Sequence, residues 1–305
     1  MSDRTRIQWC DATWNPIVGC SPASEGCAHC YAARMAKRLA GRCGYPRDFS
    51  EVTTRQHVLG QPCSWKRPRR IFTCSMGDLF HPGVRPEDRM SVFNVMRSCQ
   101  RHTFLVLTKR PQEITPDLLD FPSNVWLGVT VEGPATLRRL DALARVEAAL
   151  RFVSFEPLLG PVGDLGPWLN GTTTMHIRAD VEGMLRNRHF DGLAGENGRK
   201  LTMREAQDEL FKLHAQGVKY ISAGGCDSFD PQTGCPGHKN PPRVGWVIVG
   251  GETGPGARPM HPDWVRSIRD QCQEAGVPFF FKQDGPKHGR LLDGREWNEF
   301  PEVTP

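Results

Sequence analysis

The run Val125-Trp-Leu-Gly-Val-Thr-Val131 is apolar at nearly every position, which indicates a strand buried on both faces. Other short apolar runs have the same character and end at a glycine or a polar residue; they cover residues 70–74, 103–108, 151–155, 246–249 and 277–281. Such continuous runs favour a parallel sheet, because an antiparallel sheet with one solvated face would alternate apolar and polar residues.

Helical patterns lie between these runs. Residues 86–101 place Met90, Phe93, Val95 and Met96 on one side, residues 134–149 carry leucines at helical spacing, and residues 261–275 end at Gly276 as at a helix C-cap. This alternation predicts a right-handed parallel α/β fold, either an open sheet or a barrel. With a first strand at residues 14–18 there are about seven strands, so we predict an incomplete (β/α) barrel.

Residues 166–245 interrupt the alternation. Thr202-Met-Arg-Glu205 is a capping-box pattern that predicts a helix ending at Gly217, and polar, glycine-containing segments flank it. We therefore expect residues 1–165 and 246–305 to form the barrel core. Residues 166–245 would form a small inserted subdomain on the rim where loops carry function.

Composition restricts the class of protein. The 305 residues include 38% hydrophobic and 24% charged ones, and no apolar stretch approaches the roughly 20 residues of a membrane span. The polar N-terminal sequence MSDRTRIQWC lacks the features of a signal peptide, so we expect a cytoplasmic protein with no membrane partner. Eleven cysteines in a reducing compartment favour metal ligation over disulfides.

Three of these cysteines, Cys20, Cys27 and Cys30 in GCSPASEGCAHCYAARM, lie between an apolar run and a predicted helix. Thiolates this close together on a loop can converge on one metal centre. Three protein ligands leave one coordination position open for chemistry. The alternative is a zinc knuckle with a fourth ligand such as His29.

The second half of this motif, Cys27-Ala-His-Cys30-Tyr31-Ala, resembles the radical S-adenosylmethionine (radical SAM) superfamily, whose usual signature is C-x3-C-x2-C. The first gap here has six residues, giving C-x6-C-x2-C. The chain is also similar to a three-cysteine-motif family of phage and prophage proteins without a settled activity. That likeness covers residues 7–165 and 246–284, through TWNPIVGC, CxHCYA, SMGDLF, TKRP, GVTVE, SFEPLLG, GGETGPGARPM and FFFKQ.

The radical SAM resemblance implies a cofactor set and a reaction. Three cysteines of that superfamily hold a [4Fe–4S] cluster whose fourth iron binds S-adenosylmethionine, which implies this role for Cys20, Cys27 and Cys30. It further implies a partial barrel of the radical SAM type and an electron donor such as flavodoxin or ferredoxin. Reductive cleavage of S-adenosylmethionine would give a 5′-deoxyadenosyl radical that abstracts hydrogen from a substrate.

Residues at the carboxyl ends of the predicted strands are candidates for cofactor binding, because ligands of parallel α/β sheets bind at this rim. Ser75-Met-Gly77-Asp78 follows the second strand, where the superfamily meets the amino group of the cofactor, and Asp78 is the candidate acceptor. An ordinary glycine turn is the alternative. Contacts to ribose, methionine moiety or substrate are expected from Thr130, Glu132, Ser154, Glu156 and Glu252. The glycines Gly250 and Gly251 would let the backbone approach a ligand, unless they form a plain tight loop.

Cations at the same rim indicate an anionic substrate such as a nucleotide, a modified base or a nucleic acid. They are Lys109, Arg110, Arg258 and Lys282. Charges that simply end buried strands are the alternative. The net charge is +5, and the run 66–70 (KRPRR) is either a solvated loop or a contact with phosphates.

The inserted segment has a second metal-like pattern, Cys226-x8-Cys235-x2-His238. It offers three zinc ligands, with His176, His214 or Asp227 as a fourth, unless the loop binds no metal. Beside the radical SAM enzyme, two other functions stay open. One is a zinc-containing nucleic-acid-binding protein without catalysis, and the other is an iron–sulfur electron-transfer or sensor protein.

Overall fold

The computed structural model describes residues 5, 7–114, 121–170, 177–180, 220–223, 243–285 and 289–302. The chain divides into two compact units, Met1–Leu169 with Pro242–Pro305, which we call the barrel unit, and Asn170–Pro241. In the second unit the strands β8 (Ile177–Asp180) and β9 (Tyr220–Ala223) pair antiparallel. The helix predicted to run to Gly217 lies outside the described residues.

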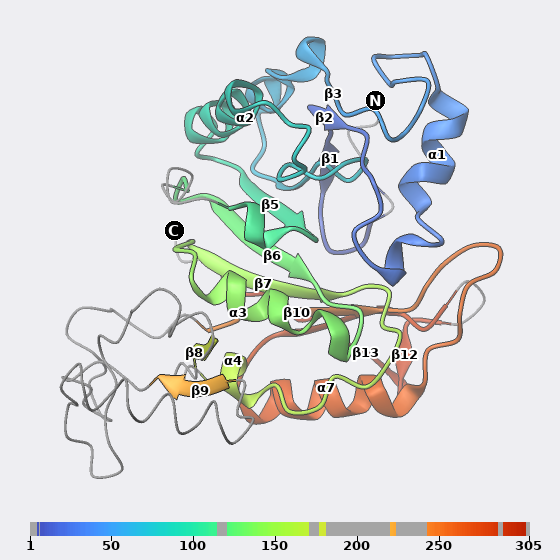
Figure 1. Cartoon of the computed structure of the whole chain (residues 1–305), viewed down its shortest axis with the longest axis vertical. Coiled ribbons are helices and arrows are strands. Elements are labelled where there is room, and N and C mark those ends of the chain that lie inside the picture. Colours follow the sequence, from blue (N-terminus) through green and yellow to red (C-terminus); the bar gives the residue numbers. More distant parts are fainter. Residues whose placement is uncertain are drawn as a thin grey trace. The chain divides into compact units, whose positions relative to one another are not determined.

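A seven-stranded parallel sheet forms the barrel unit (Figure 1). Its strands are β1 (Ala12–Trp14), β4 (Arg70–Thr73), β5 (Thr103–Thr108), β6 (Val125–Thr130), β7 (Leu150–Phe155), β10 (Trp246–Gly250) and β11 (Phe279–Gln283). They lie side by side in the order in which they occur along the chain. A doubly wound sheet would reverse this order at a switch point, whereas the continuous order curls the sheet into a half barrel. The prediction of an incomplete (β/α) barrel is therefore confirmed at this level.

The remaining elements connect these strands. The helices are α1 (Tyr31–Leu39), α2 (Pro86–Ser98), α3 (Arg138–Ala144), α4 (Gly166–Leu169) and α7 (Pro262–Glu274). Two short antiparallel pairs are β2 (Ile17–Val18) with β3 (Thr53–Thr54), and β12 (Leu291–Leu292) with β13 (Arg295–Glu296). Short 3₁₀ turns are η1 (Glu25–Cys27), η2 (Gln56–Val58), η3 (Gln61–Ser64), η4 (Pro111–Glu113) and η6 (Pro134–Thr136). No helix in the described part of the chain is both long and apolar enough to cross a membrane.

The outer face of the sheet packs against the helices. Leu127 and Val129 of β6 share one core with Phe93 of α2, Leu140 of α3 and Ile268 of α7. Because side chains alternate between the faces of a strand, the residues between these point to the inner face.

The inner face changes character along the strands. Toward the amino ends it is a second core of large side chains: Phe72, Leu105, Trp126, Phe152, Trp246, Ile248 and Phe280, with Trp9 and Cys10. Toward the carboxyl ends the positions of the same parity become small or polar: Thr130, Ser154, Glu156, Gly250 and Lys282. The barrel interior is thus closed at one end and offers polar groups at the other.

The predicted first strand at residues 14–18 is wrong. β1 ends at Trp14, and β2 pairs with β3 outside the main sheet. The side chain of Asn15 accepts a hydrogen bond from the Met76 amide at 2.9 Å, and Pro16 has no N–H for a ladder. The parallel pairing with β4 therefore stops at this point.

Two helix predictions also need correction. Met90 is 45% exposed, because the buried side of α2 is formed by Val92, Phe93 and Met96. The pattern over residues 134–149 produces an α-helix only over Arg138–Ala144. The expected end of α7 is correct, since Gly276 has a φ of +61° in the left-handed region.

Candidate functional site

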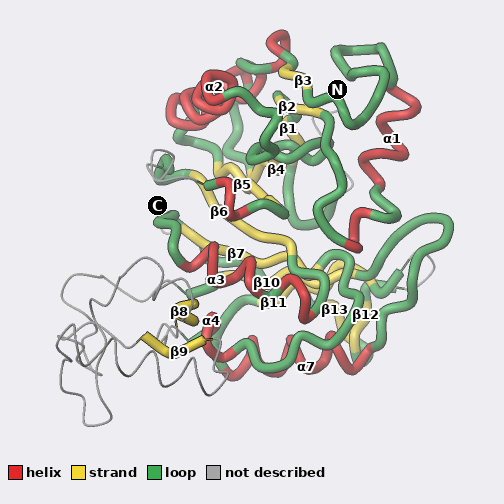
Figure 2. The backbone as a smooth tube through the Cα atoms, viewed as in Figure 1, coloured by secondary structure: helices red, strands yellow, loops and turns green. Residues whose placement is uncertain are grey.

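A cavity of about 440 Å³ lies at the carboxyl ends of the strands. Its apolar wall includes Trp9, Phe72 and Leu107, and the rest is lined by strand ends, by the start of α1 and by loop residues. The loops that follow the strands are drawn green in Figure 2. Most of the residues predicted for metal, cofactor or substrate line it: Cys20, Cys27, Cys30, Ser75, Gly77, Asp78, Lys109, Arg110, Thr130, Ser154, Glu156, Gly251, Glu252 and Lys282. Of the predicted residues that the structure describes, Glu132, Gly250 and Arg258 do not line it.

The three cysteines of the N-terminal motif are free thiols, each half-buried. Cys27 ends η1 and Cys30 is the N-cap of α1, so short helical turns set the positions of both residues. The amide of Ala23 donates to the Cys27 sulfur at 3.4 Å, and Arg110 donates to the Cys20 sulfur at 3.5 Å. Donors of this kind favour thiolates, which are the metal-binding form of cysteine.

The case that these three cysteines can hold a metal cluster rests on their sulfur donor atoms and on their position at the cavity. Among the residues that the structure describes, no three Cys, His, Asp or Glu side chains are arranged to share one metal ion. Cys20, Cys27 and Cys30 nevertheless face one cavity, and an all-sulfur donor set suits iron–sulfur or zinc chemistry. Convergence on one centre requires the Cys20 thiol to leave its hydrogen bond with the Ser21 carbonyl, 3.3 Å away.

The Cys20 thiol lies close to two charged side chains, those of Asp78 and Arg110. Burial and the nearby charge of Asp78 raise the pKa of Cys20 to about 11, although Arg110 lowers it. At neutral pH this thiol is protonated, so any metal that binds here must displace a proton.

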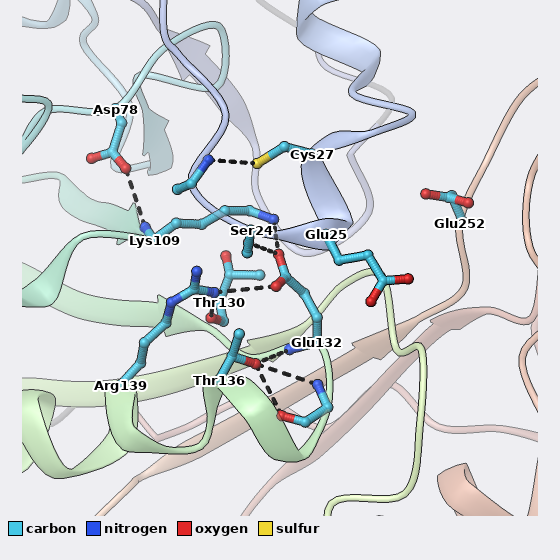
Figure 3. A network of polar contacts seen from close by, with 12 residues as sticks. Ser24, Glu25, Cys27, Asp78, Lys109, Thr130, Glu132, Thr136, Arg139 and Glu252 are labelled. Carbon is cyan, nitrogen blue, oxygen red and sulfur yellow. Dashed lines mark hydrogen bonds and ion pairs between the residues drawn. The ribbon is translucent and has the colours of Figure 1, made fainter.

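A buried ion network holds the cysteine loop from below (Figure 3). Glu132 is 3% exposed and accepts from Ser24 Oγ at 2.7 Å, from Lys109 Nζ, and from Arg139 at 3.4 Å. A Cβ at Gly26 would lie 2.5 Å from the Glu132 carboxylate, so only glycine lets the loop approach it. Glu132, predicted to contact the cofactor, instead anchors the loop that carries Cys27.

Asp78 has a similar structural role. Its carboxylate accepts from the Thr108 hydroxyl at 2.8 Å, the Phe80 amide at 3.0 Å and the Lys109 amide at 3.1 Å, and pairs with Arg110 at 3.5 Å. These donors satisfy the carboxylate within the protein. Asp78 is predicted to accept a hydrogen bond from the cofactor's amino group, but in this geometry its carboxylate has no free acceptor for that bond.

A second acidic group faces the cavity directly. Glu156 accepts from Lys282 Nζ at 2.7 Å and from Ser154 Oγ at 3.1 Å, and all three residues line the cavity. A Cβ at Gly250 would lie 2.8 Å from the Glu156 carboxylate, so this glycine makes room for a side chain rather than for a ligand. The trio can exchange hydrogen bonds with a polar ligand in the cavity.

The glycine loop after β10 is tied to the cysteine loop. Arg258 donates to Glu252 at 2.8 Å and to Glu25 at 2.7 Å, and Arg34 of α1 donates to the Thr253 carbonyl at 2.8 Å. Burial opposes ionisation of Glu252, but the hydrogen bonds and charge of Arg258 outweigh it and lower the pKa of Glu252. These contacts join the loop after β10, the sixth strand of the sheet, to the loop and helix that follow β2.

Sequence reasoning missed Arg139, Ser24 and Arg34. Arg139 is 7% exposed on α3, four residues before the buried Leu143, so its place on the inward face of a helix was a usable signal. Ser24 and Arg34 act on partners far away in the chain, and their sequence positions carry no sign of this.

The basic run 66–70 leads into β4, whose first residue is Arg70, at the end of the sheet opposite the cavity. Its last two arginines are engaged within the protein: Arg69 lies over Trp65 at 4.8 Å, and Arg70 over Phe300 at 3.9 Å. This favours the interpretation of the run as a surface segment. The second predicted metal set, Cys226, Cys235 and His238, lies outside the described residues.

The model of the family described as "Protein of unknown function (DUF5131)" matches residues 4–301. The chain belongs to the DUF5131 family. The DUF5131 match spans the cysteine loop, all seven strands of the main sheet and the segment 170–241. No curated protein and no solved structure matches the chain.

Proposed function

We propose that this DUF5131 protein is a radical SAM-type iron–sulfur enzyme. The observation that carries the proposal is that Cys20, Cys27 and Cys30 face the same cavity as the polar carboxyl ends of the parallel strands. Free thiols at this rim of a half barrel supply the metal ligands in the place where parallel α/β proteins bind substrates. When bound, a reduced [4Fe–4S] cluster supplies the electron for reductive cleavage of S-adenosylmethionine and hydrogen abstraction from substrate.

The protein's own residues would bind and orient the ligands. A cavity of about 440 Å³ falls in the range that accommodates a nucleoside-sized ligand. The Ser154–Glu156–Lys282 trio offers donors and acceptors to its polar part, and Trp9, Phe72 and Leu107 line the cavity with apolar surface that excludes water. A cytoplasmic location and an electron donor such as flavodoxin or ferredoxin complete the proposal.

Anaerobic reconstitution tests the proposal. Wild type and a Cys27→Ser/Cys30→Ser variant are loaded with iron and sulfide, and iron, sulfide, zinc and the visible spectrum are measured. We expect about four irons and four sulfides per chain in wild type only. Cleavage of S-adenosylmethionine to 5′-deoxyadenosine in the presence of a reductant then tests the reaction class.

The alternatives predict other outcomes. Stoichiometric zinc without iron, even after reconstitution, would refute the cluster and favour a zinc-containing nucleic-acid-binding protein. If a cluster forms but the protein does not bind S-adenosylmethionine, an electron-transfer or sensor protein would be favoured.

A further inference from the structure

Helix α1 carries a set of cations, of which only Arg34 takes part in the contacts between loops described above. It begins directly after Cys30 and contains Arg34, Lys37 and Arg38, and Arg42 follows its last turn. No acidic residue occurs between residues 26 and 47. We call Arg34, Lys37, Arg38 and Arg42 the α1 cations.

The buried side of α1 is small and apolar. Ala32 and Ala36 pack with Val18, Tyr45 and Met76. The opposite side is left to solvent: Lys37, Arg38 and Arg42 are exposed, and α1 lies at the edge of the barrel unit in Figure 1.

These exposed cations have no carboxylate partner among the residues that the structure describes. Helix α7 is a useful contrast within the same unit. There, Arg266 pairs with Asp263 at 2.6 Å, and Arg269 pairs with Asp293 at 2.5 Å. The charges of α7 are balanced locally, and those of α1 are not.

Helix stability alone does not explain this arrangement. Cations in the last turn, here Lys37 and Arg38, are favourable with the helix dipole. However, Arg34 and Arg38 are like charges four residues apart, a spacing that destabilises a helix, and Arg42 lies beyond the helix end. Uncompensated positive charge on an open face is instead the arrangement that attracts a polyanion.

The face also leads to the cavity. Tyr31, the first residue of α1, is 43% exposed, lines the cavity, and donates from its hydroxyl to the Ser75 carbonyl. A ligand that lies along the α1 cations would therefore reach the cavity mouth beside Cys30. Aromatic rings next to basic groups are typical of single-stranded nucleic-acid sites.

We propose that the exposed side of α1 binds the phosphate backbone of a nucleic acid. The four α1 cations can contact about four phosphates, and α1, with nine residues and a length of about 14 Å, spans roughly four phosphates of one strand along a duplex axis at about 3.4 Å each. An acidic protein partner is less suited, since protein interfaces bury about 800 Å² per side around an apolar centre. The large apolar residues that α1 exposes are Tyr31 and Met35, and Tyr31 is already tied to the Ser75 turn.

This inference deepens the proposed function by naming nucleic acid as the substrate class. Only the claim that the bound nucleic acid is a substrate rests on the proposed function. Binding itself needs no cluster. It is measured on the full chain with and without Cys27→Ser/Cys30→Ser, so that failure of the cluster and failure of the binding face are separate results.

The test is fluorescence anisotropy with a labelled single-stranded oligonucleotide and its duplex, at several salt concentrations. Four phosphate contacts predict a slope of log K against log salt of about −2.8 for single strands and about −3.6 for duplex. Lys37→Gln/Arg38→Gln should reduce the single-strand slope by about 1.4 and weaken binding about 25-fold near 0.1 M salt.

The chain offers a matched control in Lys66→Gln/Arg67→Gln. This pair is also an adjacent, exposed lysine and arginine, and its loss lowers the net charge by the same two units from +5. The proposal requires the control to bind as wild type does. Equal losses in both variants, a loss only in the control, or no nucleic-acid binding by wild type at low salt would overturn it. If wild type binds only polyglutamate, the face is instead a site for an acidic protein.

Discussion

Replacing Glu132 by glutamine should destabilise the barrel unit and free the cysteine loop. Glutamine keeps the size of the side chain but removes the charge that faces Lys109 and Arg139. It also turns one acceptor into an NH₂ donor directed at other donors. Burial already lowers the pKa of Arg139, and Glu132 opposes this shift, so the substitution leaves Arg139 as an uncompensated buried cation.

The magnitude follows from the burial of the partners. Removing one member of a fully buried ion pair costs about 3–5 kcal/mol. The Lys109 side chain is 21% exposed, and Arg139 keeps its hydrogen bond to the Thr130 carbonyl at 2.7 Å. We therefore expect a loss at the low end, about 3 kcal/mol in the free energy of unfolding.

Tryptophan fluorescence in a denaturant titration measures this loss for the barrel unit by itself, because all eight tryptophans lie within Met1–Leu169 and Pro242–Pro305. Glu25→Gln is the control. It removes the pair with Arg258, but the Glu25 side chain is 79% exposed, so the expected change is below about 1 kcal/mol.

Limited proteolysis supplies a second measurement. Faster cleavage within residues 20–30 is expected for Glu132→Gln and not for Glu25→Gln. If the free energy of unfolding of Glu132→Gln lies within about 1 kcal/mol of that of wild type, and its cysteine loop is not cleaved faster, the network does not anchor the loop.

Two further predictions concern packing and pH. Gly128→Ala should lower the free energy of unfolding by about 1–3 kcal/mol, because the new Cβ would lie 2.5 Å from the Phe152 ring. Gly60→Ala is the control, and it should change the free energy of unfolding by no more than about 0.5 kcal/mol because nothing lies within 4 Å of its Cβ. Denaturant midpoints of both variants measure the difference. Burial and the charge of Arg110 lower the pKa of His81 below its ordinary 6.5, so the folded state favours neutral His81 and loses stability as the pH falls below that value. Thermal unfolding between about pH 7 and pH 5 should therefore show a smaller decline for His81→Asn than for wild type, and equal declines would contradict the prediction.

Local patterns in the sequence determined most of the sheet. Continuous apolar runs require burial on both faces wherever they occur, so six of the seven strands were predictable from runs such as 125–131. The exception is the first strand, where Asn15 and Pro16 end the pairing through a contact with Met76 that a hydrophobic pattern does not report. The placement of strand ends at one rim also follows from the sequence, because parallel strands direct all their carboxyl ends the same way.

The sequence alone determined which residues gather at the rim, and the tertiary structure decided what each of them does there. Glu132 and Glu156 occupy similar places after neighbouring strands. Glu132 is bound by Ser24, 108 positions away, whereas Glu156 faces the cavity with Lys282, 126 positions away. Hydrophobic periodicity records whether a position is buried, but the partner of a buried charge is set by distances between segments that only the folded chain brings together.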